Sequence, residues 1–103
     1  MTTPLTVTPT LNADGRPALA VAGEVDMSNA DQLAAAVDNA LATDTVPLLV
    51  DLAELTYVDS AGLRVLLKRA EKIELIANPI LLPVLTICGL TQLTSVKEAD
   101  PGT

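Results

Sequence analysis

The stretch VDLAELTYVDSAGLRVLLKRAE, residues 50–71, decides the fold because it passes from a buried strand through a turn into an amphipathic helix. The strand begins in the apolar run of residues 48–50, which is typical of a strand covered on both faces. Residues 59–62, Asp-Ser-Ala-Gly, then open the helix. Its predicted apolar side consists of Leu63, Leu66, Leu67 and Ala70. Its predicted polar side consists of Arg64, Lys68, Glu71 and Lys72.

Ser60 stands at or beside the N-cap of this helix, where its hydroxyl can accept a hydrogen bond from a free amide of the first turn. The free amides and the positive end of the helix dipole also suit a phosphate. Phosphorylation adds about −1.5 to −2 charges beside Asp59. Gly62 removes a side chain where another backbone could approach closely. Ser60 is therefore interpreted as a structural cap or as a surface switch, and the two roles are compatible.

The chain before this stretch predicts a hairpin and a helix. Leu5, Val7, Pro9 and Leu11 alternate, as in a strand with one buried face, and the proline suggests an edge position. Residues 12–15, Asn-Ala-Asp-Gly, form the predicted turn, and residues 18–25 return as a second strand. Residues 28–31, Ser-Asn-Ala-Asp, resemble a capping box, with Ser28 as the cap. The helix that follows carries Leu33, Val37 and Leu41 at helical spacing.

The chain after it predicts a strand, a third helix and a last short strand. Residues 73–77 form the strand, Asn78-Pro79 caps the helix, which runs towards Gly89, and the last strand lies near residues 94–96. We expect one α/β domain over residues 1–103, with an ordered core at about 5–97 and a frayed tail at 98–103. Its sheet is mostly parallel, with four to five strands, an antiparallel edge strand and about three helices.

The predicted third helix has almost no polar face, because six large aliphatic side chains lie between Ile80 and Ile87. Pro83 also removes one helical hydrogen bond and crowds the first turn. If the helix packs by one side only, the remaining side chains form an apolar surface of the kind that marks a protein contact. We expect a partner or a second copy of the chain, as a homodimer through residues 80–87, to cover it. The alternative is a shortened or irregular helix that buries most of these residues.

Composition limits the possible cores and partners. Half of the 103 residues are hydrophobic but Tyr57 is the only aromatic residue, so the core consists of Leu, Val, Ile and Ala. The net charge is −7, and the segment 17–63 holds eight acids and no Lys or Arg. A surface of this kind repels phosphate backbones, which makes nucleic acid an unsuitable partner.

No segment suggests membrane insertion or export. The longest apolar stretch, residues 80–87, is far shorter than the roughly 20 residues that span a bilayer. The first residues have neither a basic region nor a long apolar region, so no signal peptide is predicted. The single cysteine, Cys88, cannot form an internal disulfide, which fits a reducing compartment. We expect a cytoplasmic protein.

The sequence offers no support for catalysis. It has no histidine, no metal-ligand cluster, no Gly-x-Ser-x-Gly elbow around Ser60 and no P-loop pattern. A serine nucleophile would therefore lack a visible base. We expect a protein that is not an enzyme and needs no cofactor.

Two motifs resemble those of a known family. Asp51-Leu52 together with residues 59–63, Asp-Ser-Ala-Gly-Leu, closely resembles the signature of STAS domains, as found in bacterial anti-sigma-factor antagonists. Residues 23–26, Gly-Glu-Val-Asp, look like the second motif of that family, at the end of its second strand. The resemblance covers residues 5 to about 96. The short connection after the second helix and the early end of the chain depart from the family pattern, which leaves the oligomeric state and the partner open.

The resemblance implies a signalling function in transcription and the stress response. The unmodified protein would bind an anti-sigma factor and release a sigma factor. That anti-sigma factor is an ATP-dependent serine kinase, which would phosphorylate Ser60 and switch binding off, and a serine phosphatase would reset the system. The implied partner-binding residues are Glu24, Asp26, Ser28, Asp59, Ser60, Ala61, Gly62 and Arg64.

Other interpretations of the same residues remain open. A STAS accessory subunit could dock on a membrane transporter from the cytoplasmic side, and some family members resemble weak nucleotide-binding modules. Asp26 and Asp51 could simply bond turn backbones. Arg64 and Lys68 could form a solvated helix face or steer an acidic partner towards Ser60.

Overall fold

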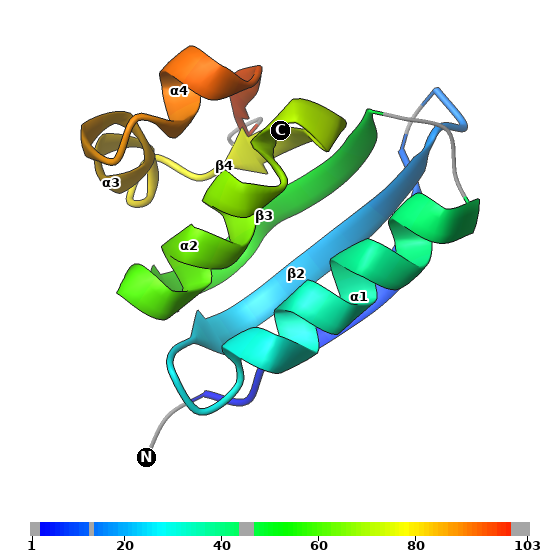
Figure 1. Ribbon diagram of the computed structural model, residues 1–103. Helices are drawn as coiled ribbons and strands as arrows, with labels where there is room; N and C mark the ends of the chain where they lie inside the picture. Colours follow the sequence, from blue (N-terminus) through cyan, green and yellow to red (C-terminus); the bar gives the residue numbers. More distant parts are fainter. Residues whose placement is uncertain (1–2, 13, 44–46, 100–103) are drawn as a thin grey trace.

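Five strands form one sheet in the computed structural model, which describes residues 3–12, 14–43 and 47–99 (Figure 1). The strands lie in the sheet in the order in which they occur in the chain, and β1 is antiparallel to β2 while all other pairs are parallel. This arrangement confirms the predicted α/β fold with an antiparallel edge. The strands are β1 (Thr6–Leu11), β2 (Pro17–Val25), β3 (Leu48–Val58), β4 (Ile73–Ala77) and β5 (Val96–Glu98).

Helices α1 and α2 lie side by side on one face of the sheet, and α4 packs against α2 (Figure 1). The predicted third helix ends at Gly89 as expected, because Gly89 has a φ of 93°, a conformation that favours glycine, and a further short helix that the sequence did not predict follows it. The described residues therefore contain four α-helices instead of about three. They are α1 (Ala30–Thr43), α2 (Ser60–Lys68), α3 (Leu82–Ile87) and α4 (Leu90–Leu93), with a 3₁₀ turn η1 (Ala70–Lys72). No helix in the described part is long and apolar enough to cross a membrane.

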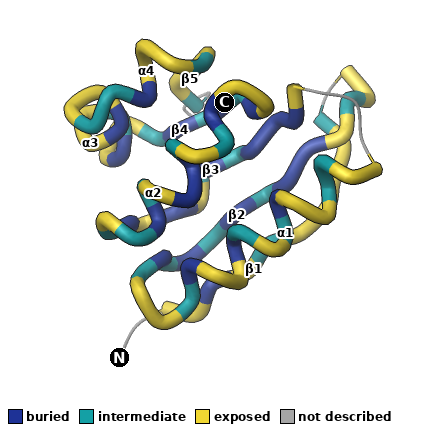
Figure 2. The backbone as a smooth tube through the Cα atoms, viewed as in Figure 1, coloured by how far each residue is buried: buried dark blue, intermediate teal, exposed yellow. Residues whose placement is uncertain are grey.

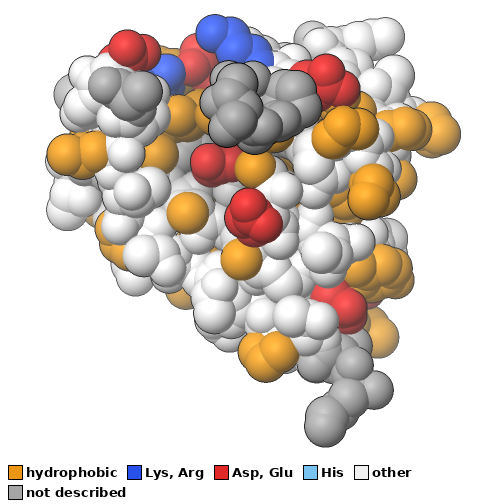
Figure 3. Space-filling model, turned by 180° about the vertical axis from the view of Figure 1, so that it is seen from behind, with side chains coloured by type: hydrophobic (Ala, Val, Ile, Leu, Met, Phe, Trp, Pro, Cys, Tyr) orange, Lys and Arg blue, Asp and Glu red, His pale blue; other side chains and the backbone are white. Residues whose placement is uncertain are grey.

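The core lies between the sheet and these helices (Figure 2). As predicted, it is aliphatic, because Tyr57 is 49% exposed. The opposite face of the sheet carries half-buried small and acidic residues, and Figure 3 shows acidic side chains scattered over it. Residues 48–50 are all buried, as expected, although α1 and α2 cover only one face of the sheet. The central buried side chains are those of Leu33, Val37, Val50, Leu52, Leu55, Leu66, Leu75 and Leu85.

Strand β3 is longer than the sequence predicted, because the expected turn after residues 48–50 is absent and the strand continues to Val58. Its second half stays paired with β2, and two register shifts along this pair absorb extra residues of β3. The long strand carries the chain directly to Asp59 and thereby sets where α2 begins.

The β1–β2 hairpin has the predicted turn but a different buried face. The side-chain oxygen of Asn12 accepts the amides of Asp14 and Arg16, both at 2.9 Å, and Gly15 has a φ of 78°. Leu5 is buried, whereas Pro9 and Leu11 are exposed. The expected buried face is therefore wrong at its far end, because these side chains line an open groove of about 710 Å³ beside α1 instead of entering the core.

The α3 region has the exposed apolar surface that the sequence predicted. Leu81 and Leu85 are buried, while Ile80, Val84 and Ile87 are exposed, Ile87 by 87%. The regular helix begins at Leu82 and not at Pro79. The amides of Leu81 and Leu82 already donate to the carbonyl of Asn78, and Pro83, which has no N–H, cannot continue this series to the carbonyl of Pro79, in agreement with the expected loss of one helical bond. Coverage of this surface by a second copy or a partner stays a prediction.

The end of the described chain belongs to the sheet. Strand β5 begins at Val96, two residues beyond the predicted start, and the amide of Ala99 donates to the carbonyl of Ala77 at 2.7 Å. The rest of the tail that was expected to fray, residues 100–103, lies outside the described residues.

Asn78 joins α3 to the middle of β3. Its side-chain Nδ2 donates to the carbonyls of Ala53 at 3.1 Å and Leu55 at 2.7 Å, and its Oδ1 accepts the amides of Ile80 and Leu81, both at 3.0 Å. The amide group thus supplies donors to one segment and an acceptor to the other.

We expect Asn78→Asp to lower the free energy of unfolding by about 2 kcal/mol or more, because a carboxylate keeps the acceptor but turns an oxygen towards two carbonyls. Urea denaturation followed by circular dichroism measures the effect. Asn39→Asp, the same change at an exposed position of α1, is the control. Equal losses in both variants would contradict the assigned bonds.

Candidate functional site

The candidate site lies where β2 and β3 end. These strands are parallel and Val25 pairs with Val58, so the segments that follow them meet at the same edge of the sheet. The amide of Asp59 donates to the carbonyl of Val25 at 3.1 Å, which closes this junction. The loop of residues 26–29 is therefore placed beside the first turn of α2, although about 30 residues separate them in the chain.

Asp59, and not Ser60, is the N-cap of α2. It has extended backbone, with φ −98° and ψ −173°, and its Oδ1 accepts the amides of Ala61 at 2.8 Å and Gly62 at 3.1 Å. Its Oδ2 accepts the amide of Met27 at 3.1 Å. The prediction that Ser60 could serve as the cap is therefore wrong. A carboxylate has two acceptor oxygens, so this one residue can cap the helix and also bind the neighbouring loop.

Ser60 is the first residue of α2 and is exposed. Among the described residues its hydroxyl makes no hydrogen bond to another side chain or to the backbone. The amides of Ala61 and Gly62, expected to be free for a phosphate, are already bound by Asp59. A phosphate on Ser60 would therefore lie beside the Asp59 carboxylate and would not replace it as the acceptor of these amides.

The loop after β2 is organised around Asp26 and Asn29. The Ser28 hydroxyl donates to Asp26 Oδ1 at 2.5 Å and the Ser28 amide donates to the same oxygen at 2.8 Å. These bonds, the hydroxyl first, hold the pKa of Asp26 below its ordinary value because they favour the ionised carboxylate. The predicted capping box is therefore wrong, since Ser28 donates to Asp26 and the helix begins only at Ala30.

Asn29 is a positioning residue that the sequence analysis missed. Its Oδ1 accepts the amide of Asp26 at 2.9 Å, and its Nδ2 donates to the carbonyl of Glu24 at 3.0 Å. An asparagine between a strand and a helix is a common turn signal, but its partners cannot be read from its neighbours in the chain.

Gly62 and Gly23 allow close packing at this edge of the sheet. A Cβ on Gly62 would lie 2.6 Å from Val58 Cγ2 and 2.7 Å from Val25 Cγ1, so side chains, and not the expected backbone, approach it. The backbone approach occurs at Gly23, where a Cβ would lie 2.0 Å from the carbonyl oxygen of Pro4. Gly23 also has a φ of 95°, which favours glycine.

The structure brings together most of the predicted site residues. Asp26, Ser28 and Asp59 line an open hollow of about 460 Å³ with Met27, while Ser60 and Arg64 follow on the exposed side of α2. Ala61 and Gly62 form the first turn beneath them. Glu24 does not line the hollow and contributes its backbone carbonyl to Asn29. Met27 is 84% exposed at the centre of the site, and no pattern in the sequence singled it out.

Comparisons with known proteins agree on the kind of domain. The family model described as "Mlab, STAS domain" matches residues 10–94. An anti-sigma factor antagonist from Mycobacterium paratuberculosis is 25% identical, with a TM-score of 0.79 over 91% of this chain and 86% of that chain. The unphosphorylated form of the anti-sigma factor antagonist SpoIIAA is 18% identical, with a TM-score of 0.69 over 93% and 90% of the two chains. No curated protein matches the sequence significantly.

We expect Asp59→Ala to lower the free energy of unfolding by about 1 to 2 kcal/mol, the usual cost of a lost N-cap. Because Oδ2 also binds the Met27 amide, the amide resonances of residues 26–29 should move as well as those of residues 60–63. Thermal denaturation and NMR measure the two effects. Glu54→Ala removes an exposed acid from β3 and should change neither. Movement confined to residues 60–63 would contradict the link to the loop.

Ser28→Ala should raise the pKa of Asp26 part of the way to its ordinary value, because the hydroxyl bond is lost and the amide bond remains. NMR titration of the side-chain carboxyl measures this, with Ser95→Ala as the control. The lowered pKa contributes stability that is present above the unfolded-state pKa and lost as the pH falls through the folded-state pKa. The stability difference between wild type and Ser28→Ala should therefore shrink in acid, and a difference that grows there would contradict the bond.

Proposed function

The chain belongs to the STAS domain family, and we propose that it is an anti-sigma-factor antagonist switched off by phosphorylation of Ser60. The observation that carries the proposal is the exposed Ser60 hydroxyl, which lies at the edge of the sheet beside the hydrogen-bonded acidic loop of residues 26–29. The resemblance of residues 59–63 to the family signature supports the same residue as the phosphoacceptor. The similarity to the Mycobacterium paratuberculosis antagonist supports a protein partner of the anti-sigma class.

The proposed switch works by charge and needs no change of fold. Phosphorylation adds about −1.5 to −2 charges beside the carboxylates of Asp59 and Asp26. Asp59 already uses the amides that could offset this charge, and the lowered pKa of Asp26 keeps that carboxylate ionised. The added charge therefore faces outward, where it repels an acidic or apolar partner surface.

The proposed cycle assigns catalysis to the partners and binding to this chain. In the cytoplasm, the unphosphorylated form binds an anti-sigma factor that is a serine kinase, and a sigma factor is released. The kinase transfers a phosphoryl group from ATP to the Ser60 oxygen, with the hydroxyl proton lost, and the complex separates. A serine phosphatase then hydrolyses the phosphoserine. The chain has no histidine to activate Ser60 as a nucleophile of its own.

We expect Ser60→Ala to bind the cognate anti-sigma factor about as well as wild type, and Ser60→Glu to bind at least about tenfold more weakly. Candidate anti-sigma kinases from the same genome serve as partners in titration calorimetry. Incubation with each kinase and ATP, followed by mass spectrometry, should place the phosphate on Ser60. Ser95→Ala, which removes a hydroxyl far from the site in sequence, is the control.

Genuinely phosphorylated protein should bind as weakly as Ser60→Glu or more weakly, with shifts of backbone resonances confined to residues 22–29 and 57–66. Equal affinity of the phosphorylated and unphosphorylated forms would contradict the switch. Binding to a transporter component with no binding to any anti-sigma factor would favour an accessory subunit instead.

A further inference from the structure

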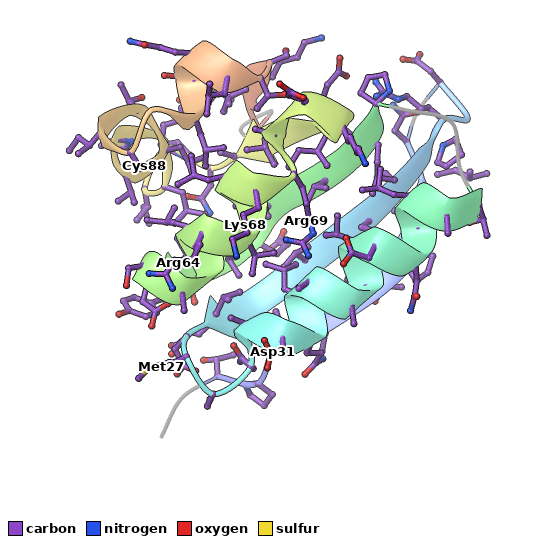
Figure 4. The ribbon with its side chains drawn as sticks, in the orientation of Figure 1. Met27, Asp31, Arg64, Lys68, Arg69 and Cys88 are labelled. Atoms are coloured by element: carbon purple, nitrogen blue, oxygen red, sulfur yellow. The ribbon has the colours of Figure 1, made fainter. Side chains whose placement is uncertain are left out.

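A groove of about 350 Å³ runs between α1 and α2 and ends at Met27, next to the Ser60 site (Figure 4). Its floor consists of small or buried apolar residues and its rim consists of charged ones. The floor residues are Ala30, Ala34, Ala61 and Val65. The charged residues are Asp31 on α1, Arg64 and Lys68 on α2, and Arg69 immediately after α2.

The basic residues of this acidic protein are concentrated at this groove. The chain has 13 acidic and six basic residues, and three of the six, Arg64, Lys68 and Arg69, line the groove. In Figure 4 the side chains of Arg64, Lys68 and Arg69 extend from α2 and its C-terminal end on the face of the molecule that holds the groove. A single acidic residue, Asp31, lines the groove in the described part of the chain. The rim is therefore positive on a molecule whose net charge is −7.

Arg69 differs from Arg64 and Lys68 in how its charge is used. Its Nε and Nη2 donate to the two carboxylate oxygens of Asp38 at 2.8 and 2.9 Å, which ties α2 to α1 and holds the pKa of Asp38 below its ordinary value. Within the described residues, Arg64 and Lys68 have no ion-pair partner within 4.0 Å. Two exposed cations therefore remain available on the rim, four residues apart on the same side of α2.

We propose that the groove between α1 and α2 binds an acidic segment of the protein partner. This inference rests on the proposed function for the existence of such a partner. Carboxylates of the segment meet Arg64, whose guanidinium can bind one bidentately, and Lys68. An apolar side chain of the segment packs on the alanine floor, and the exposed Met27 adapts its flexible side chain to it. Charge complementarity of this kind raises both specificity and the rate of association.

The groove also connects binding to the phosphorylation of Ser60. Ser60 and Arg64 are four residues apart on α2, the spacing at which side chains on a helix meet. A phosphate on Ser60 competes with the acidic segment for the Arg64 guanidinium, because both offer charged oxygens to the same donors. Phosphorylation thus adds negative charge and at the same time removes one of the two available cations from the groove.

The direct test uses a synthetic peptide of alternating Glu and Leu as the probe and ¹⁵N-labelled full-length protein. We expect the amides of Ala30, Ala34, Ala61 and Val65 to shift, and affinity to fall as salt is added. The peptide with Gln in place of Glu should not bind. R64Q/K68Q should weaken binding by about tenfold or more. K72Q/K97Q lowers the net charge by the same amount outside the groove and should change affinity by less than about threefold.

Phosphorylation should weaken peptide binding in the wild type, and the additional loss should be smaller in Arg64→Gln, because that variant has no guanidinium for the phosphate to capture. No binding by the wild type at millimolar peptide, shifts centred on Ile80, Val84 and Ile87, or equal affinities of R64Q/K68Q and K72Q/K97Q would overturn the inference.

The test separates this inference from the proposed function. If the peptide results hold but no anti-sigma factor binds the wild type, the proposed function fails and the groove stands. If an anti-sigma factor binds R64Q/K68Q as tightly as wild type and Ser60→Glu still prevents binding, the groove inference fails and the switch stands.

Discussion

The carboxylate of Asp59 holds together the two chain segments from which the site is built. One oxygen binds the first free amides of α2 and the other binds the amide of Met27 in the loop after β2. Hydrogen bonds to a charged acceptor are stronger than those between neutral groups, so the loop and the helix keep one relative position. The bonds depend on the parallel pairing of β2 and β3, which brings the ends of both strands to the same edge of the sheet.

This arrangement divides two roles between neighbouring residues. Because Asp59 caps α2, Ser60 needs no structural bond and its hydroxyl stays exposed. Gly62 lets the first turn pack against Val25 and Val58, so the serine stands on a rigid base. A modification at such a position can change the charge of the surface without disturbing the core. Because the Ser60 hydroxyl is exposed and makes no structural bond, the proposed switch acts on partner binding and not on stability.

The surface around the serine has two parts of opposite charge. The loop side presents Asp26 and Asp59, and the α2 side presents Arg64 and Lys68 next to a shallow apolar floor. Both long helices pack on one face of the sheet (Figure 1), and the groove lies between them. The fold thus places an acidic and a basic region on either side of Ser60, so the proposed phosphorylation of this serine would alter the electrostatics of both.

The sequence by itself determined the features that depend on neighbouring residues. The alternation of apolar residues, the Asn-Ala-Asp-Gly turn and the Asp-Ser-Ala-Gly motif were enough to predict the hairpin and the order of the strands and longer helices, because these signals are local. Only the tertiary structure decided the rest. Four features depend on which side chains meet in the folded chain. Asp59 and not Ser60 is the cap of α2, Ser28 donates to Asp26, Asn29 bonds the loop to β2, and Arg64 and Lys68 lie near Met27. The bond from Met27 to Asp59 spans 32 residues, and such contacts arise only when parallel strands bring distant segments to one edge of the sheet.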